Sequence, residues 1–225
     1  MADFEKEKTM ILNYFFDFDK TLASSGDASV KATKQAFQDN GLTVPTTDEI
    51  LDAMGIPAEV SFPQMAKETL TTDQVTKLVA RFREVYSDYE LASTKLYPGI
   101  QEMLDQLTQR HKNLFIVSSK RTDAVDRNLN NLNIRHYFKD VVGCDQVDHY
   151  KPAPDGILLL IEKYQLQKDD CMMIGDARYD LQMGKAAGVH TCGVTWDAFD
   201  IDSLKREKPT YLIDAPTKLI SLGQD

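Results

Sequence analysis

Residues 10–21 read MILNYFFDFDKT, an apolar and aromatic run that ends abruptly in polar residues. The run is too short for a typical helix, and it is apolar at successive positions rather than at alternate ones. Such a stretch is typical of a strand that is buried on both faces, as in a parallel sheet. Residues 10–18 therefore predict a central strand, with Asp17 and Asp19 at its carboxyl end.

Short apolar runs of the same kind recur along the chain, and helical patterns separate them. The runs lie at residues 113–118, 141–144, 171–174, 189–194 and 211–213. Between them, apolar residues are spaced three and four apart, as at Ile100, Met103 and Leu107, which is the spacing of one helix face. Strands that alternate with helices predict an α/β fold, a three-layer, Rossmann-like core with a parallel sheet between two helical layers.

One region of the chain breaks this alternation. Residues 23–93 show helical patterns at 28–40, 47–54 and 72 to about 91, and Gly41 is placed to end the first of them. We find no convincing strand in this region. A helical insertion after the first strand predicts an all-helical cap domain of residues 23–93. The α/β core would then be discontinuous, with residues 1–22 and 94–225.

Composition and charge narrow the possible partners and location. The chain has 225 residues, of which 42% are hydrophobic, and a formal net charge of −9. Broad nucleic-acid binding needs a basic surface, so we expect none. Three cysteines without metal-ligand spacing suit a reducing compartment. The start of the chain lacks a secretory signal pattern, and no apolar run is long enough to span a bilayer. These features predict a cytoplasmic protein without a membrane partner and leave the oligomeric state open.

Polar residues also follow the other apolar runs. Ser118 and Ser119 follow one run and Asp176 follows another, with Asp180 one helical turn further on; Lys151 lies in a loop after a third. Each alone has an ordinary explanation as a helix cap or a surface charge. In an open parallel sheet, however, the carboxyl ends of the strands meet at one edge, where ligands bind. We therefore expect carboxylates, a hydroxyl and an ammonium group to converge there with Asp17 and Asp19.

Four motifs now stand in order: DFDKT at 17–21, LFIVSSK ending at 120, KPAP at 151–154 and GDARYD at 175–180. In these motifs the sequence resembles the haloacid dehalogenase superfamily, specifically its phosphoglycolate-phosphatase-like branch with a helical cap. The resemblance covers nearly the whole chain. It implies a Mg²⁺-dependent hydrolase that cleaves small phosphate monoesters through an aspartyl-phosphate intermediate.

The resemblance also implies roles for the two acids of the first motif and their partners. Asp17 would be the nucleophile and a metal ligand, and Asp19 the general acid and base, with its backbone carbonyl on the metal. Asp176 would be a further metal ligand. Lys151 would be a catalytic residue that binds phosphate and balances the carboxylates.

The remaining motif residues would support these groups. Thr21, Ser118 and Ser119 would contact the phosphate, and Thr21 is similar to the residue that favours phosphatases over dehalogenases. Asp180 would lie behind the metal ligands or orient Lys151. The alternative that Asp180 is an ordinary carboxylate on a helix surface stays open.

Two positions depart from the family pattern. Lys20 replaces the usual Gly of the first motif, where it could tune phosphate affinity or simply be exposed, in a conformation that a side chain tolerates. Ser24 stands where relatives often carry Asp. The exact substrate therefore stays open among small phosphorylated metabolites such as a sugar phosphate, phosphoglycolate, a nucleotide or pyrophosphate. Residues 54–57 of the cap are candidates for setting specificity.

Three other functions compete with the hydrolase hypothesis. A phosphosugar mutase of the β-phosphoglucomutase type shares the cap and all four motifs, although mutases often have an apolar residue where Thr21 stands. A non-catalytic phosphate-binding module has the same fold, but the intact acids and Lys151 argue against it. A receiver-type signalling domain also uses an aspartate and Mg²⁺, but it would be much shorter and would lack the helical insertion.

Overall fold

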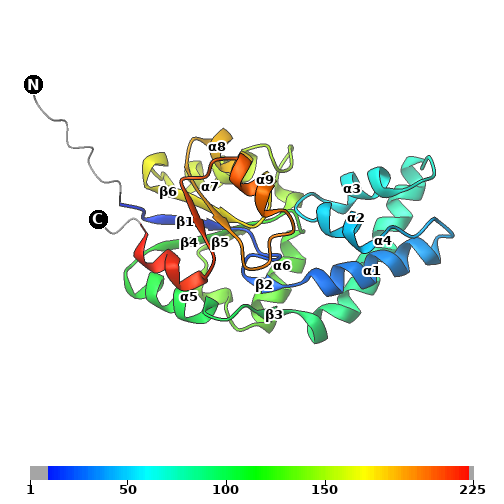
Figure 1. Ribbon diagram of the computed structural model, residues 1–225, viewed down its shortest axis with the longest axis horizontal. Helices are drawn as coiled ribbons and strands as arrows, with labels where there is room; N and C mark the ends of the chain where they lie inside the picture. The colour runs from blue at the N-terminus through cyan, green and yellow to red at the C-terminus, as the bar shows by residue number, and fades with distance from the viewer. Residues whose placement is uncertain (1–9, 223–225) are drawn as a thin grey trace, which may run out of the picture.

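A six-stranded parallel sheet forms the centre of the computed structural model, which describes residues 10–222 (Figure 1). Its strand order is β5-β4-β1-β6-β7-β8. The strands are β1 (Asn13–Phe16), β4 (Asn113–Val117), β5 (Asp140–Val142), β6 (Cys171–Gly175), β7 (His190–Val194) and β8 (Tyr211–Ile213). The predicted α/β fold is confirmed, and each predicted apolar run overlaps one of these strands. The parts of the predicted core at residues 1–9 and 223–225 lie outside the described residues.

The central strands are buried on both faces, which explains why their sequences are apolar throughout. Tyr14 and Phe16 belong to a hydrophobic cluster on one face, and Phe15, between them, belongs to a separate cluster on the other. Helices α5 (Ile100–Gln109) and α6 (Thr122–Asn131) cover the first face. Helices α7 (Asp155–Tyr164) and α8 (Arg178–Ala187) cover the second, and the short α9 (Ile201–Arg206) packs beside α8. The result is the predicted three-layer arrangement.

Four helices between β1 and α5 lie to one side of the sheet (Figure 1). They are α1 (Gly26–Asp39), α2 (Thr47–Asp52), α3 (Ala58–Met65) and α4 (Thr72–Ser93), and we call them the four-helix insertion. They enclose a hydrophobic cluster of their own, which includes Phe37, Phe62 and Leu78. The division into a core domain and a cap domain at residues 23 and 93 stays a prediction.

Two features of the four-helix insertion differ from the sequence prediction. Helix α3 was not predicted; it is only eight residues long and contains Pro63. Strand β2 (Ala23–Ser24) pairs antiparallel with β3 (Lys95–Leu96), although we expected no strand in residues 23–93. Each of these strands has two residues, too few to give a periodic pattern. Together they form a ribbon at the junction between the sheet and the four-helix insertion.

The sheet topology places the candidate residues at one edge. Strand β1 lies between β4 and β6, and the chain passes from β5 on one side of β1 to β6 on the other. Such a reversal of strand order opens a crevice at the carboxyl ends of the strands. Within residues 10–222, no helix has the length and apolar character needed to cross a membrane.

Candidate active site

Asp17 is fixed at the end of the central strand and is held from two sides. Its N–H donates to the carbonyl of Ile174 on β6 at 2.9 Å, and the residue is only 5% exposed. Its Oδ1 accepts a hydrogen bond from Lys151 Nζ at 2.7 Å. Lys151 Nζ also donates to Asp180 Oδ1 at 2.7 Å. The predicted convergence of Asp17, Lys151 and Asp180 is thus present in the structure.

Asp180 is held in place through both of its carboxylate oxygens. Oδ1 accepts from Lys151, and Oδ2 accepts from the Ala177 N–H at 3.1 Å at the start of α8. The carboxylate packs against Gly175, where an added Cβ would lie 2.2 Å from Asp180 Oδ2. Only glycine therefore allows this approach. Asp180 is 1% exposed, so it is not an ordinary surface carboxylate.

Asp176 and Thr21 connect the first and fourth motifs. The hydroxyl of Thr21 donates to Asp176 Oδ1 at 3.0 Å. The Trp196 indole N–H donates to the carbonyl of Thr21 at 3.1 Å and so anchors the loop after β1. This contact of Trp196 could not be predicted, because nothing in the sequence pattern shows which loop the indole contacts.

The carboxylates at this edge of the sheet lie close enough together to shift one another's pKa values. Oxygen atoms of Asp17, Asp176 and Asp180 lie within 4.8 Å of one another. The pKa of Asp17 is raised to about 7, chiefly by burial, with Lys151 opposing the shift and Asp180 adding to it. Burial, Asp180 and Asp17 likewise hold the pKa of Asp176 well above its ordinary value. Three buried carboxylates around one ammonium group favour a second, compact positive charge, and their hard oxygen atoms suit Mg²⁺.

The ammonium group of Lys151 stays charged in this setting. Burial lowers its pKa, but the attraction of Asp17 and Asp180 outweighs that effect and raises the pKa above its ordinary value. Lys151 therefore offers a permanent cation beside Asp17. A negatively charged phosphoryl group that approached Asp17 would meet it directly.

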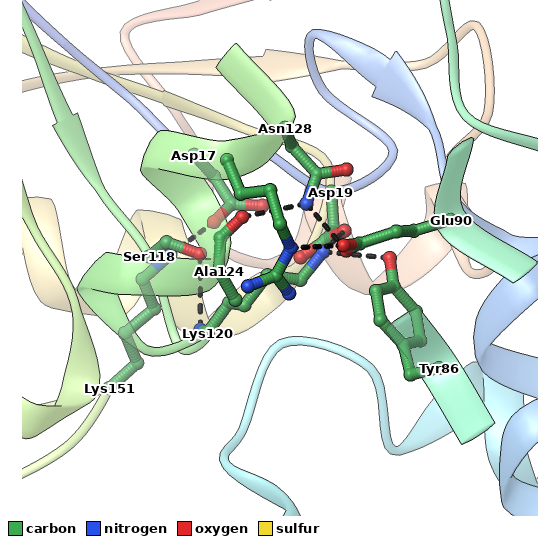
Figure 2. A network of polar contacts seen from close by, with 10 residues as sticks. Asp17, Asp19, Tyr86, Glu90, Ser118, Lys120, Ala124, Asn128 and Lys151 are labelled. Carbon is green, nitrogen blue, oxygen red and sulfur yellow. Dashed lines mark hydrogen bonds and ion pairs between the residues drawn. The ribbon is translucent and has the colours of Figure 1, made fainter. Parts of the chain in front are cut away.

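Asp19 lies at the boundary between the sheet edge and the four-helix insertion (Figure 2). Lys120, just beyond β4, donates to Asp19 Oδ1 at 2.8 Å and to the hydroxyl of Tyr86 on α4, also at 2.8 Å. Ser118 Oγ accepts the backbone N–H of Lys120 at 3.1 Å. Lys120 is part of the second motif, but its motif predicts no role for it, because its partner Tyr86 is 34 residues away in the chain.

A second contact joins the same helix to the sheet domain. Glu90 of α4 is 2% exposed and accepts hydrogen bonds from two residues of α6. The donors are Arg127 and Asn128, the latter at 2.9 Å (Figure 2). Helix α4 is therefore attached to the sheet edge through Tyr86 and to α6 through Glu90.

Two of the predicted residues occupy positions that we did not expect. The hydroxyl of Ser119 donates to the carbonyl of Gly55 in the four-helix insertion at 2.6 Å, so its predicted phosphate contact stays a prediction. Lys20 is 4% exposed, so the alternative of an exposed side chain is wrong. Its φ of 60° lies in the left-handed region, which few residues other than glycine adopt. The chain therefore keeps the backbone of the usual glycine while adding a buried cation.

A cavity of about 280 Å³ lies between the four-helix insertion and the sheet edge. Asp19, Ser119 and Lys120 line it on the sheet side. On the other side it is lined by residues 54–56, which are three of the four positions predicted to set specificity. Their role in specificity stays a prediction, but their place beside Asp19 is consistent with it.

The sequence model of the haloacid dehalogenase-like hydrolases matches residues 14–194, which include all four motifs. The chain belongs to this family. A phosphoglycolate phosphatase from Vibrio parahaemolyticus is 28% identical to this hydrolase over 213 residues, covering 92% of this chain and 93% of the relative. The pyrophosphatase PpaX of Listeria monocytogenes is 27% identical over 216 residues, covering 96% and 97% of the two chains.

A solved structure agrees with this assignment. A haloacid dehalogenase-like family hydrolase from Streptococcus pneumoniae has 26% sequence identity and a TM-score of 0.84. The similarity covers 95% of this chain and 99% of that one. By its family and its relatives, the protein is an enzyme, a haloacid dehalogenase-like phosphatase.

Proposed function

We propose that this hydrolase cleaves small phosphate monoesters with Asp17 as its nucleophile and Mg²⁺ as its cofactor. The observation that carries the proposal is the setting of Asp17. Its carboxylate is buried, bound by Lys151 at 2.7 Å, and grouped with Asp176 and Asp180 at the carboxyl edge of the sheet. A carboxylate in contact with a fixed cation is suited to attack an anionic phosphoryl group.

The reaction would proceed through two displacements at phosphorus. In the first, an oxygen of Asp17 bonds to phosphorus, the bond to the leaving oxygen breaks, and Asp19 gives that oxygen its proton. In the second, Asp19 takes a proton from water, and the resulting hydroxide attacks phosphorus. The bond to Asp17 breaks, and inorganic phosphate leaves. Lys151 and the hydroxyl of Ser118 would bind the oxygens of the phosphoryl group throughout.

The metal would be held by the carboxylates of Asp17 and Asp176 and the backbone carbonyl of Asp19. When bound, Mg²⁺ offsets negative charge on the carboxylates and on the phosphoryl oxygens. The three clustered acids include Asp180, but both of its oxygens already accept hydrogen bonds. We therefore assign Asp180 to positioning Lys151 rather than to the metal.

A small substrate fits the site better than a macromolecule does. Asp17 is buried, and the four-helix insertion covers the sheet edge through Lys120 and Ser119. The relatives named above act, by their names, on phosphoglycolate and on pyrophosphate, which are both small phosphorylated compounds.

Release of phosphate from p-nitrophenyl phosphate and from a panel of phosphorylated metabolites, with Mg²⁺ or with EDTA, tests this function. We expect turnover with Mg²⁺ only, and its loss in Asp17→Asn. Asp169→Asn, which changes an exposed aspartate outside the site, is the matched control and should keep full activity. Absence of metal-dependent turnover on every ester would overturn the proposal. Transfer of phosphate to a sugar in preference to water would instead favour the mutase.

A further inference from the structure

The side chains that line the cavity beside Asp19 indicate which kind of leaving group the substrate has. In the proposed function, on which this inference rests, Asp19 protonates the leaving oxygen. Asp19 lines the cavity, and Asp17 lies deeper in the site at 5% exposure. A phosphoryl group on Asp17 would therefore direct its leaving group past Asp19 and into this cavity.

Much of the cavity wall away from Asp19 is apolar, with Ser29, Thr33 and Ser61 among its polar members. It is formed by side chains of the four-helix insertion and of the loop that joins α2 to α3. These side chains include Ile50, Met54, Ile56, Phe62, Met65 and Phe82. Apolar walls with a few polar groups at one end are typical of sites for small organic ligands. A volume of about 280 Å³ leaves room for more than a two-carbon acid.

The cations that line the cavity are already matched by carboxylates. Lys120 pairs with Asp19 at 2.8 Å, and Arg121 pairs with Asp123 at 3.1 Å. Arg83 of α4 pairs with Glu59 of α3, and Arg127 pairs with the buried Glu90. Each of the four lysine and arginine side chains in the described lining thus has an acidic partner. A second anionic group on the substrate would have to compete with these carboxylates for the cations and would be repelled by them.

We infer that the leaving group is an uncharged and largely apolar alcohol, either aryl or alkyl, rather than a carboxylate-bearing or phosphate-bearing one. This substrate class differs from those that the two named relatives take. The apolar wall would contact the organic part of the leaving group, and Asp19 would meet its oxygen. Charge balance in the cavity disfavours a second anion, while the buried acids and Lys151 still bind the transferred phosphoryl group.

Benzyl phosphate and phosphoglycolate test the inference in the wild-type enzyme. Both release a primary alcohol, so they differ mainly in the charge and polarity of the leaving group. We expect kcat/KM to be higher for benzyl phosphate by roughly tenfold or more, which corresponds to about 1.4 kcal/mol of differential binding in the transition state. A preference for phosphoglycolate would overturn the inference and leave the proposed function intact. Failure to hydrolyse any phosphoester with Mg²⁺ would overturn the proposed function itself.

A variant that removes one negative charge from the cavity lining tests the same inference. Glu59→Gln frees Arg83 inside the cavity and should raise the ratio of kcat/KM for phosphoglycolate to that for benzyl phosphate several-fold. The matched control is Glu84→Gln, which removes a carboxylate partner of Arg81 on the same helix but outside the cavity lining. It should leave that ratio unchanged. An unchanged ratio in Glu59→Gln, or an equal rise in both variants, would contradict the inference.

Discussion

The proposed chemistry of this enzyme depends on a few buried carboxylates that are costly to keep ionised. Asp17 has a pKa raised to about 7, chiefly because it is buried. Between the pKa of the unfolded chain, near 4, and this value, the folded protein holds a proton that the unfolded chain has lost. The stability contributed by this group is therefore complete below pH 4 and lost as the pH rises through 7.

The pH dependence of the stability that Asp17 contributes gives a prediction for Asp17→Asn in metal-free buffer. The neutral amide removes the cost of ionising Asp17, so the variant should gain stability relative to the wild type as the pH rises from 5 to 8. The gain should be about 1 kcal/mol or more, since one pKa unit corresponds to about 1.4 kcal/mol. Denaturant unfolding at both pH values measures it. A difference in unfolding free energy that does not vary with pH would contradict this account of the site.

Lys120 gives a second prediction at the scale of the residue. It holds Asp19 at 2.8 Å and Tyr86 at 2.8 Å, so we expect it to position the general acid. Lys120→Met should lower kcat for an alkyl phosphate by roughly tenfold or more. It should lower kcat much less for p-nitrophenyl phosphate, whose leaving group needs little protonation. Tyr86→Phe should act in the same direction and more weakly. Equal losses on both substrates would indicate a general structural role instead.

The motif residues could be predicted because strand ends in a parallel sheet meet at one edge. Asp17, Lys151 and Asp176 each follow or flank an apolar run, and the structure brings them together. The link from Lys120 to Tyr86 and the anchoring of Thr21 by Trp196 could not be predicted. Each joins distant segments through the contacts of one pair of residues, which leave no periodic signal in the sequence.

At the scale of the element, the turn from β6 into α8 determines where Lys151 lies. Gly175 ends β6, and the Asp180 carboxylate fills the space where its side chain would be. Gly175→Ala should therefore push Asp180 away from Lys151 and lower kcat by roughly tenfold or more. Gly26→Ala is the control, since its Cβ would lie 3.6 Å from the nearest side chain. Unchanged kcat in a folded Gly175→Ala would show that Asp180 does not position Lys151.

Elements with strong periodicity were predicted well, and short ones were not. The strands of the sheet were found from their apolar runs, although Met10–Phe18 shortens to Asn13–Phe16 because only those residues pair on both sides. Helix α3 was missed because its eight residues are too few for a periodic pattern and include Pro63. The β2–β3 ribbon depends on a pairing between residues about seventy positions apart.

At the scale of the whole molecule, binding of Mg²⁺ should stabilise the folded enzyme. A ligand that binds only the folded state raises the unfolding free energy by mass action, by about 2.7 kcal/mol at a hundred times its Kd. Mg²⁺ should therefore raise the Tm of the wild type and of Asp169→Asn, but much less that of Asp176→Asn. Thermal unfolding with Mg²⁺ or EDTA measures this. An equal rise in all three proteins would place the ion elsewhere.

The position of the four-helix insertion over the sheet could be anticipated only in outline. The sequence predicted a helical region after the first strand, but not the contacts that hold it at the site. Those contacts, such as Ser119 to Gly55 and Asn128 to Glu90, form between surfaces that have ordinary helical and loop sequences. Residues 54–56 of the cavity lining were predicted from the sequence, and the rest of the lining was identified from the structure.

The claim that Asp17 carries the phosphoryl group is tested most directly by the stereochemical course at phosphorus. An isotopically chiral thiophosphate ester would be hydrolysed by the Mg²⁺-loaded wild-type enzyme in isotopically labelled water, and the configuration of the product determined. Two displacements, first by Asp17 and then by water, each invert the phosphorus centre, so the account predicts net retention. Net inversion would show that water attacks the substrate directly, and it would contradict the role of Asp17 as nucleophile.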